Sequence, residues 1–177
     1  MNRIEQISYH NSILLEEIPE YRAQAEAFPQ EASAQRRLLR SLMNVRPPRP
    51  LKPEFLAVQD ELLSFEREEN GVVRAENLPA CARDTRLAVW QGDITRLAVD
   101  AIVDADNSAL LGCFCPCHGC IDNAIHSAAG FQLRDECNEI MQHQGHMELP
   151  GHAKLTHAYN LPARYILHTV GFIIQGG

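Results

Sequence analysis

The first half of the chain carries apolar residues at the spacing of amphipathic helices. In EASAQRRLLRSLMN (31–44) the apolar side chains share one face and charged residues occupy the other. The residues of that apolar face are Ala34, Leu38, Leu39 and Leu42. The proline-rich segment VRPPRPLKP (45–53) cannot continue a helix, so the pattern predicts a break there.

A second helix is predicted in EFLAVQDELLSFERE (54–68), with Pro53 at its start, where proline is tolerated. Its apolar stripe is expected to serve packing and comprises Phe55, Val58, Leu62 and Phe65. No residue before position 85 is typical of a catalytic site.

The pattern changes after residue 85. Short runs rich in Val, Ile and Leu, bounded by glycine or polar residues, predict strands at 87–92, 99–104, 153–159 and 164–170. Between them, residues 121–145 carry apolar positions at intervals of four and end at Gly145, which predicts one long helix. Strands alternating with a helix indicate an α/β layer. We therefore divide the chain into a helical N-terminal extension (1–85) and an α/β part (86–177).

The overall charge argues against nucleic-acid binding. The 177 residues include 23 acidic and 16 basic side chains and have a net charge of −7, whereas contacts with phosphates need clustered Lys and Arg. No apolar run is long enough to span a membrane, and MNRIEQISYHNS does not resemble a signal peptide. We expect a cytoplasmic protein.

Four of the six cysteines lie in LLGCFCPCHGC (110–120), together with His118. In a reducing cytosol, clustered thiols are more often metal ligands or catalytic groups than disulfides. Zinc binds Cys thiolates and His nitrogens, with four protein ligands in structural sites and three in catalytic ones. The spacing does not match the common iron–sulfur runs. The loop therefore predicts a zinc site.

Several motifs together resemble those of the zinc-dependent macrodomains, which act as protein-ADP-ribose hydrolases. They are VWQGDITRLAVDAIV (89–103), an Asn-Ser pair, CIDNAIH (120–126), AAG (128–130), AYNLP (158–162) and LHTVG (167–171). GCF, Pro116, His118 and CIDN mark the zinc-containing branch, and the resemblance covers about residues 37–177. It implies a mixed sheet flanked by helices, with ADP-ribose across the carboxyl ends of the strands.

The resemblance also implies the site residues. Asp93 would contact adenine, with Ile94 beside it, and Asn107 would contact the distal ribose. Cys120, Ile121 and Asp122 would lie at the start of the long helix, near the ribose and pyrophosphate. Asn107 and Asp122 are the expected catalytic residues. Taken alone, Asp122 is equally typical of a helix cap, Asp93 of a turn, and His126 of a packing residue.

Cys113, His118 and Cys120 are the zinc ligands that the family pattern implies, with a fourth position facing the substrate. Cys115 and Cys117 depart from the family. They are expected to be inert loop residues, and the alternative is that one closes the site as a fourth ligand. The remaining histidines form no second metal-like pattern in the sequence.

Two further features depart from the family. Asp104-Ala105-Asp106 replaces the family's Asn-Ala-Ala, which would place two carboxylates near a pyrophosphate at a cost of roughly 1–4 kcal/mol. The alternative is that these carboxylates are protonated or point away from the ligand. The sequence also ends at GFIIQGG (171–177), before the second phosphate loop that the family carries. We therefore expect a C-terminally shortened member with an unpaired apolar strand, RYILHTV or a neighbour, at a sheet edge.

The expected function is removal of ADP-ribose from mono-ADP-ribosylated protein side chains. The family implies a lipoylated carrier protein as substrate and a sirtuin-like ADP-ribosyltransferase as functional partner. The alternatives are an ADP-ribose reader, an inactive remnant, or a structural zinc or thiol loop.

Overall fold

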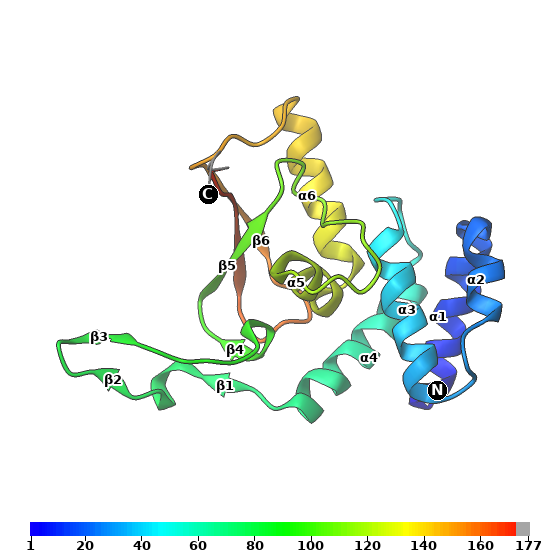
Figure 1. Cartoon of the computed structure of the whole chain (residues 1–177), viewed down its shortest axis with the longest axis horizontal. Coiled ribbons are helices and arrows are strands. Elements are labelled where there is room, and N and C mark those ends of the chain that lie inside the picture. Colours follow the sequence, from blue (N-terminus) through cyan, green and yellow to red (C-terminus); the bar gives the residue numbers. More distant parts are fainter. Residues whose placement is uncertain (173–177) are drawn as a thin grey trace.

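The structure is a computed structural model and describes residues 1–172. The segment GFIIQGG, on which the expectation of a shortened chain rested, lies mostly outside the described residues. Figure 1 shows a helical N-terminal part beside a small sheet that helices α5 and α6 cover. Among the described residues, no helix is both long and apolar enough to cross a membrane.

The N-terminal part is helical, as expected. Its helices are α1 (Arg3–Glu17), α2 (Arg22–Glu26), α3 (Ala32–Val45) and α4 (Pro53–Asn70). Short 3-10 helices occur at Pro19–Tyr21, Ala75–Asn77 and Ile94–Arg96. Pro53 occupies the first turn of α4, which confirms its predicted place. Helices α1, α3 and α4 pack around a core that includes Ile7, Leu14, Leu39, Leu42 and Leu62.

The buried face of α4 differs from the predicted stripe. Phe55 and Leu62 are buried as expected, but Phe65 is 52% exposed and Val58 is only half-buried. Gln59 and Leu63 take their places. The cause is a tertiary contact, because the Gln59 side chain accepts a hydrogen bond from the Phe131 backbone N–H (3.0 Å) and turns this face toward α6.

A three-stranded mixed sheet forms the centre of the second part, in the order β5-β7-β6. Strand β5 (Ala101–Asp106) pairs parallel with β7 (Tyr165–Val170), and β6 (Ala153–His157) pairs antiparallel with β7. RYILHTV is therefore the central strand, so of the two expected edge positions the one in a neighbouring strand agrees with the structure. Within the described chain its neighbours β5 and β6 are the outer strands, and Val103 and Leu155 are exposed on them.

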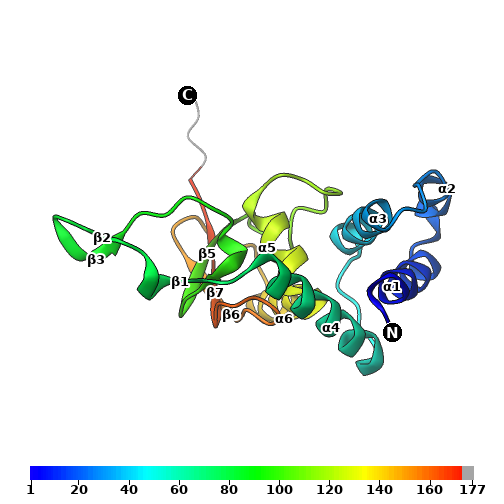
Figure 2. The same ribbon diagram turned by 90° about the horizontal axis from the view of Figure 1, so that it is seen from below.

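Four strands outside this sheet lie between α4 and β5, and Figure 2 shows β2 and β3 extending away from the sheet. They are β1 (Val73–Arg74), β2 (Ala80–Cys81), β3 (Asp84–Ala88) and β4 (Leu97–Ala98). The predicted strand 87–92 is strand only at its first two residues, which end the exposed β2–β3 hairpin. The strand predicted at 99–104 lies two residues further on, as β5.

The predicted long helix is two helices, α5 (Ile121–Ala129) and α6 (Phe131–Gln144). Gly130 separates them with φ of 101°, a backbone angle that side chains with a Cβ rarely adopt. Gly145 ends α6 in the left-handed conformation, as predicted. The helices cover one face of the sheet through a second core that includes Ile102, Ile125, Leu133 and Ile166.

Candidate functional site

The cysteine-rich loop (107–120) runs from the end of β5 to the start of α5, and residues from two helices hold it in place. Asn123 of α5 donates to the Cys115 carbonyl oxygen (2.9 Å) and to Cys113 Sγ (3.4 Å). Asn44 of α3 accepts from the Cys117 N–H at 2.9 Å. Arg40, also of α3, donates to Asn123 Oδ1 at 2.8 Å. The helical extension therefore takes part in positioning the loop.

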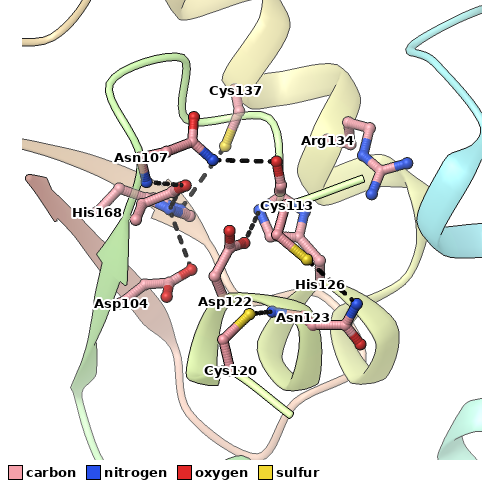
Figure 3. A network of polar contacts seen from close by, with 12 residues as sticks. Asp104, Asn107, Cys113, Cys120, Asp122, Asn123, His126, Arg134, Cys137 and His168 are labelled. Carbon is pink, nitrogen blue, oxygen red and sulfur yellow. Dashed lines mark hydrogen bonds and ion pairs between the residues drawn. The ribbon is translucent and has the colours of Figure 1, made fainter. Parts of the chain in front are cut away.

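Cys113, His118 and Cys120 converge in this loop. One ligand atom from each lies within 4.8 Å of the other two, so that small side-chain movements would bring all three onto one ion. Figure 3 shows Cys120 at the start of α5, and the thiol of Cys113, from the preceding loop, close to Asn123. Two thiols and an imidazole are a donor set that suits zinc. The geometry fits a three-ligand site.

The two thiols of this group differ in acidity. Burial raises the pKa of Cys113, but the hydrogen bond from Asn123 and the other contacts outweigh it, and the net pKa is lowered. Burial, followed by the neighbouring Cys113, raises the pKa of Cys120. Cys113 is therefore the first of the pair to become a thiolate, the form that binds metals and acts as a nucleophile.

Cys115 and Cys117, the other two cysteines of the loop, lie outside this group of candidate ligands. Cys117 Sγ lies 3.3 Å from Ser41 Oγ and 3.6 Å from the Arg37 carbonyl oxygen, both on α3. Cys115 is exposed. Neither belongs to the three-residue group, which favours the interpretation of both as loop residues.

Asp122 lies in the first turn of α5 and is buried. The N-cap is Cys120, whose sulfur accepts from the Asn123 N–H, so the capping role considered for Asp122 is wrong. Asp122 Oδ1 instead faces His126 Nε2 at 3.5 Å. Burial, with the nearby Asp106 and Asp104, raises the pKa of Asp122 to about 8. The group can therefore carry a proton at neutral pH.

Asn107 lies where the resemblance places it, at the end of β5, but its side chain is engaged in its own turn. The amide donates to the Gly112 carbonyl oxygen at 3.1 Å and accepts from the Ala109 N–H at 2.9 Å. A ribose hydroxyl would have to compete with these two contacts.

Asp93 caps the short 3-10 helix Ile94–Arg96, where its carboxylate accepts from the Thr95 N–H and hydroxyl. It lines a cavity of about 200 Å³ between the helical extension and α5. Ile94 and Ile121 are partly buried against the sheet core. Asp93 is the one predicted ligand contact among the residues lining this cavity, so the described chain does not bring all of them to a single cavity.

Asp104 and Asp106 do not face solvent. Along β5 the even positions are buried and the odd ones exposed, so both carboxylates point into the layer between the sheet and the helices. Asp106 Oδ2 is 3.3 Å and Asp104 Oδ2 is 3.5 Å from His168 Nδ1. The strand register turns both side chains inward, which favours the alternative that they point away from a pyrophosphate.

The sequence did not indicate the residues that hold the cysteine-rich loop in place. It also did not indicate a buried cluster of His and Asp side chains between the sheet and α5. Asn123, Asn44 and Arg40 act across long sequence separations and carry no motif of their own. His126 and His168 come together with Asp104 and Asp106 in the interior. The alternation of β5 could have indicated that both aspartates share its buried face.

Comparison with known proteins identifies the fold. Residues 103–177 match the Macro domain family. A protein-ADP-ribose hydrolase from Treponema medium is 51% identical over 165 residues, which cover 92% of this chain and 62% of the relative. A protein of the same name from Staphylococcus aureus (strain MSSA476) is 52% identical over 134 residues, or 76% of this chain and 50% of the relative. The chain thus spans between half and two thirds of these curated relatives.

A solved structure agrees with this assignment. The Trypanosoma brucei macrodomain in complex with ADP-ribose is 32% identical, with a TM-score of 0.52 over 75% of this chain and 59% of that chain. The parallel pair of central strands, the helices that cover the sheet and the sequence similarity all point to the same fold. The chain has the macrodomain fold, an α/β arrangement with a mixed sheet and flanking helices, preceded by N-terminal helices.

Proposed function

We propose that this protein is a zinc-dependent hydrolase that removes ADP-ribose from mono-ADP-ribosylated protein side chains. The observation that carries the proposal is the convergence of Cys113, His118 and Cys120 beside the buried carboxyl of Asp122. The two relatives named protein-ADP-ribose hydrolase support it, since they share about half of their aligned residues with this chain.

The loop residues would hold the ion. Three protein ligands leave a zinc ion an open position, and the bound ion would supply Lewis acidity toward a ribose hydroxyl or water. Asn123 prepares the site, because its hydrogen bond helps to stabilise the Cys113 thiolate.

Groups at the start of α5 would bind the pyrophosphate and transfer a proton during the reaction. The N–H groups at the start of this nine-residue helix suit a pyrophosphate, together with the neighbouring Cys120 and Ile121. Asp122 can hold a proton near neutral pH and could deliver it to the leaving oxygen, or orient a water through its carboxyl oxygens. Asn107 would orient the distal ribose after losing one of the two hydrogen bonds that its side chain makes with Ala109 and Gly112.

Asp93 and Ile94 would receive the adenine. Asp93 is exposed, and only one of its oxygens binds Thr95, so the other is available to accept from an exocyclic amino group.

The resemblance to zinc-dependent macrodomains also supplies the proposed setting. The substrate would be a modified cytoplasmic protein, such as a lipoylated carrier, and the modifying enzyme a sirtuin-like ADP-ribosyltransferase. The sequence motifs support this setting without identifying the modified side chain.

One observation favours a second candidate, an ADP-ribose reader without turnover. The Asn107 amide is already hydrogen-bonded within its own turn and Asp122 is buried, so neither expected catalytic group is free on the surface.

The two candidates differ in one measurement. Purified protein, with its zinc content measured, is incubated with a mono-ADP-ribosylated protein, and free ADP-ribose is quantified. Release that is lost on chelation and restored by zinc supports the hydrolase. Saturable ADP-ribose binding without release supports the reader, and zinc with neither activity would indicate a structural loop.

A further inference from the structure

A second group of metal-ligating side chains lies behind the loop, in the interior of the fold. Asp104 and Asp106 come from β5, His126 from α5 and His168 from β7, and one ligand atom from each lies within 4.8 Å of the others. All four are buried, with exposed fractions of 0%, 8%, 4% and 0% in that order. Figure 3 shows Asp104 and His168 on adjacent strands, where they are register partners, with His126 approaching from the helix.

Several polar atoms of this cluster have no hydrogen-bond partner within the described chain. They are both carboxylate oxygens of Asp104 and both ring nitrogens of His126. A buried polar group without a partner costs about 1–3 kcal/mol, and more if it is charged. A group that satisfies several of these atoms at once would therefore stabilise the fold.

The spacing of the atoms suits a metal ion. The His168 Nδ1 atom is 3.3 Å from Asp106 Oδ2 and 3.5 Å from Asp104 Oδ2, both long for hydrogen bonds of a charged pair. Ligands about 2.1 Å from a tetrahedral ion are separated from one another by roughly 3.4 Å. The two contacts of His168 Nδ1 therefore already have the separation of neighbouring ligands around one ion, and one ligand atom of each aspartate lies within 4.8 Å of the other.

His168 is also oriented as a metal ligand would be. Its other nitrogen, Nε2, lies 2.9 Å from the Thr156 hydroxyl on β6. When Nε2 carries the hydrogen and donates it to Thr156, the lone pair of Nδ1 points at the two carboxylates. Metal-bound histidines are commonly fixed by such an outer hydrogen bond.

Without an ion, His168 keeps a proton on its ring. Burial lowers the pKa of His168, but Asp104 and Asp106 outweigh it and raise the pKa to about 11. Metal binding would displace that proton.

The charges then balance. Two carboxylates neutralise a divalent ion, and two neutral imidazoles complete a set of two oxygens and two nitrogens. The neighbouring Asp122 faces His126, and Cys137 Sγ lies 3.7 Å from His168 Nε2, on the side away from the carboxylates.

We propose that Asp104, Asp106, His126 and His168 bind a second divalent transition-metal ion, separate from the cysteine loop and without sulfur ligands. The ion would join β5, β7 and α5. Because the cluster is closed off from solvent, the ion would enter as the chain folds.

The test uses Co²⁺ as the probe. The full chain is unfolded with a chelator and refolded with Co²⁺, and bound metal and the visible spectrum are measured. Cys113→Ser combined with Cys120→Ser removes the loop site. This double variant is expected to keep one Co²⁺ per chain, with ligand-field bands and no thiolate-to-metal charge-transfer band. Because this measurement leaves the buried cluster unchanged, it does not depend on whether variants of the cluster fold.

Further variants identify the ligands. In the double-variant background, Asp104→Asn should abolish the remaining ion, whereas Asp100→Asn, a matched change of an exposed carboxylate, should leave it. Thr156→Val should weaken binding on the order of 10-fold to 100-fold. A double variant that refolds without Co²⁺ would overturn the proposal. So would loss of the ion on Cys137→Ser with retention on Asp104→Asn, since Cys137 forms an alternative group with the two histidines.

Discussion

Asn44, near the end of α3, accepts a hydrogen bond from the backbone N–H of Cys117, 73 residues later in the chain, at 2.9 Å. The same asparagine donates to Ser127 Oγ on α5 at 2.9 Å. One side chain of the helical extension thus ties the cysteine loop to the helix that follows it.

Changing Asn44 to Ala should loosen this loop. We expect a loss of about 1–3 kcal/mol in the free energy of unfolding, because the buried partners lose their hydrogen bonds. Zinc affinity should fall as well, since the loop is no longer held in one conformation. Urea unfolding and zinc titration measure the two effects. Ser33→Ala, at an exposed position of the same helix, is the control, and an equal loss of zinc affinity there would contradict the role given to Asn44.

Changing Cys120 to Ser should lower zinc content and abolish release of ADP-ribose, because a hydroxyl is a far poorer zinc ligand than a thiolate. Cys115→Ser is the matched control and should leave both nearly unchanged, since Cys115 is exposed and outside the converging group. Metal analysis and the release assay measure the two quantities. Equal losses in both variants would refute a site with three protein ligands.

Changing Gly130 to Ala should destabilise the fold by more than about 1 kcal/mol. The residue has φ of 101°, and an added Cβ would lie 2.6 Å from Gln59 Nε2. Gly145→Ala separates the two causes, because Gly145 also has positive φ but has no atom within 4 Å of the added Cβ. Thermal unfolding of both variants should show the larger loss for Gly130→Ala, and the opposite order would exclude the contact with Gln59 as a cause.

The free energy of unfolding should decrease at acid pH because Glu66 becomes protonated. Burial would raise the pKa of Glu66, but Arg36 and Arg3 outweigh it and lower the pKa below 4.5. A carboxyl group with a lowered pKa in the folded state contributes stability above its unfolded pKa and loses that contribution as the pH falls through the folded one. The free energy of unfolding, measured from about pH 7 to about pH 3, should therefore decline once the pH falls below the ordinary pKa of a glutamate.

Glu66→Gln should cost roughly 1–3 kcal/mol at neutral pH and flatten this decline. Arg36 donates to both Glu66 oxygens at 2.7 Å, and Glu66 is only 13% exposed. Glu68→Gln is the control, because that side chain is 67% exposed. An unchanged pH dependence in Glu66→Gln would show that other groups cause the acid loss.

The sequence predicted those parts of the molecule that depend on local pattern. The helices 31–44 and 54–68, the end at Gly145 and the strand 164–170 follow from periodicity and turn chemistry. The three candidate zinc ligands also lie together as the motif predicted.

Features set by tertiary contacts could not be predicted. Gln59 became buried because it binds Phe131 of another helix, and the break at Gly130 interrupts a pattern that reads as continuous. The inward direction of Asp104 follows the alternation along β5, but its contact with His168 depends on the pairing of β5 with β7, which is far away in the sequence. The division into residues 1–85 and 86–177 stays a prediction.

Phe131, the first residue of α6, is buried among the side chains of α1, α3 and α4. An anchor of this kind makes the two parts of the chain thermodynamically interdependent, because neither can melt without uncovering an aromatic ring. We therefore expect the chain to unfold in one cooperative transition. A substitution that destabilises the N-terminal helices would then also destabilise the metal-binding loop.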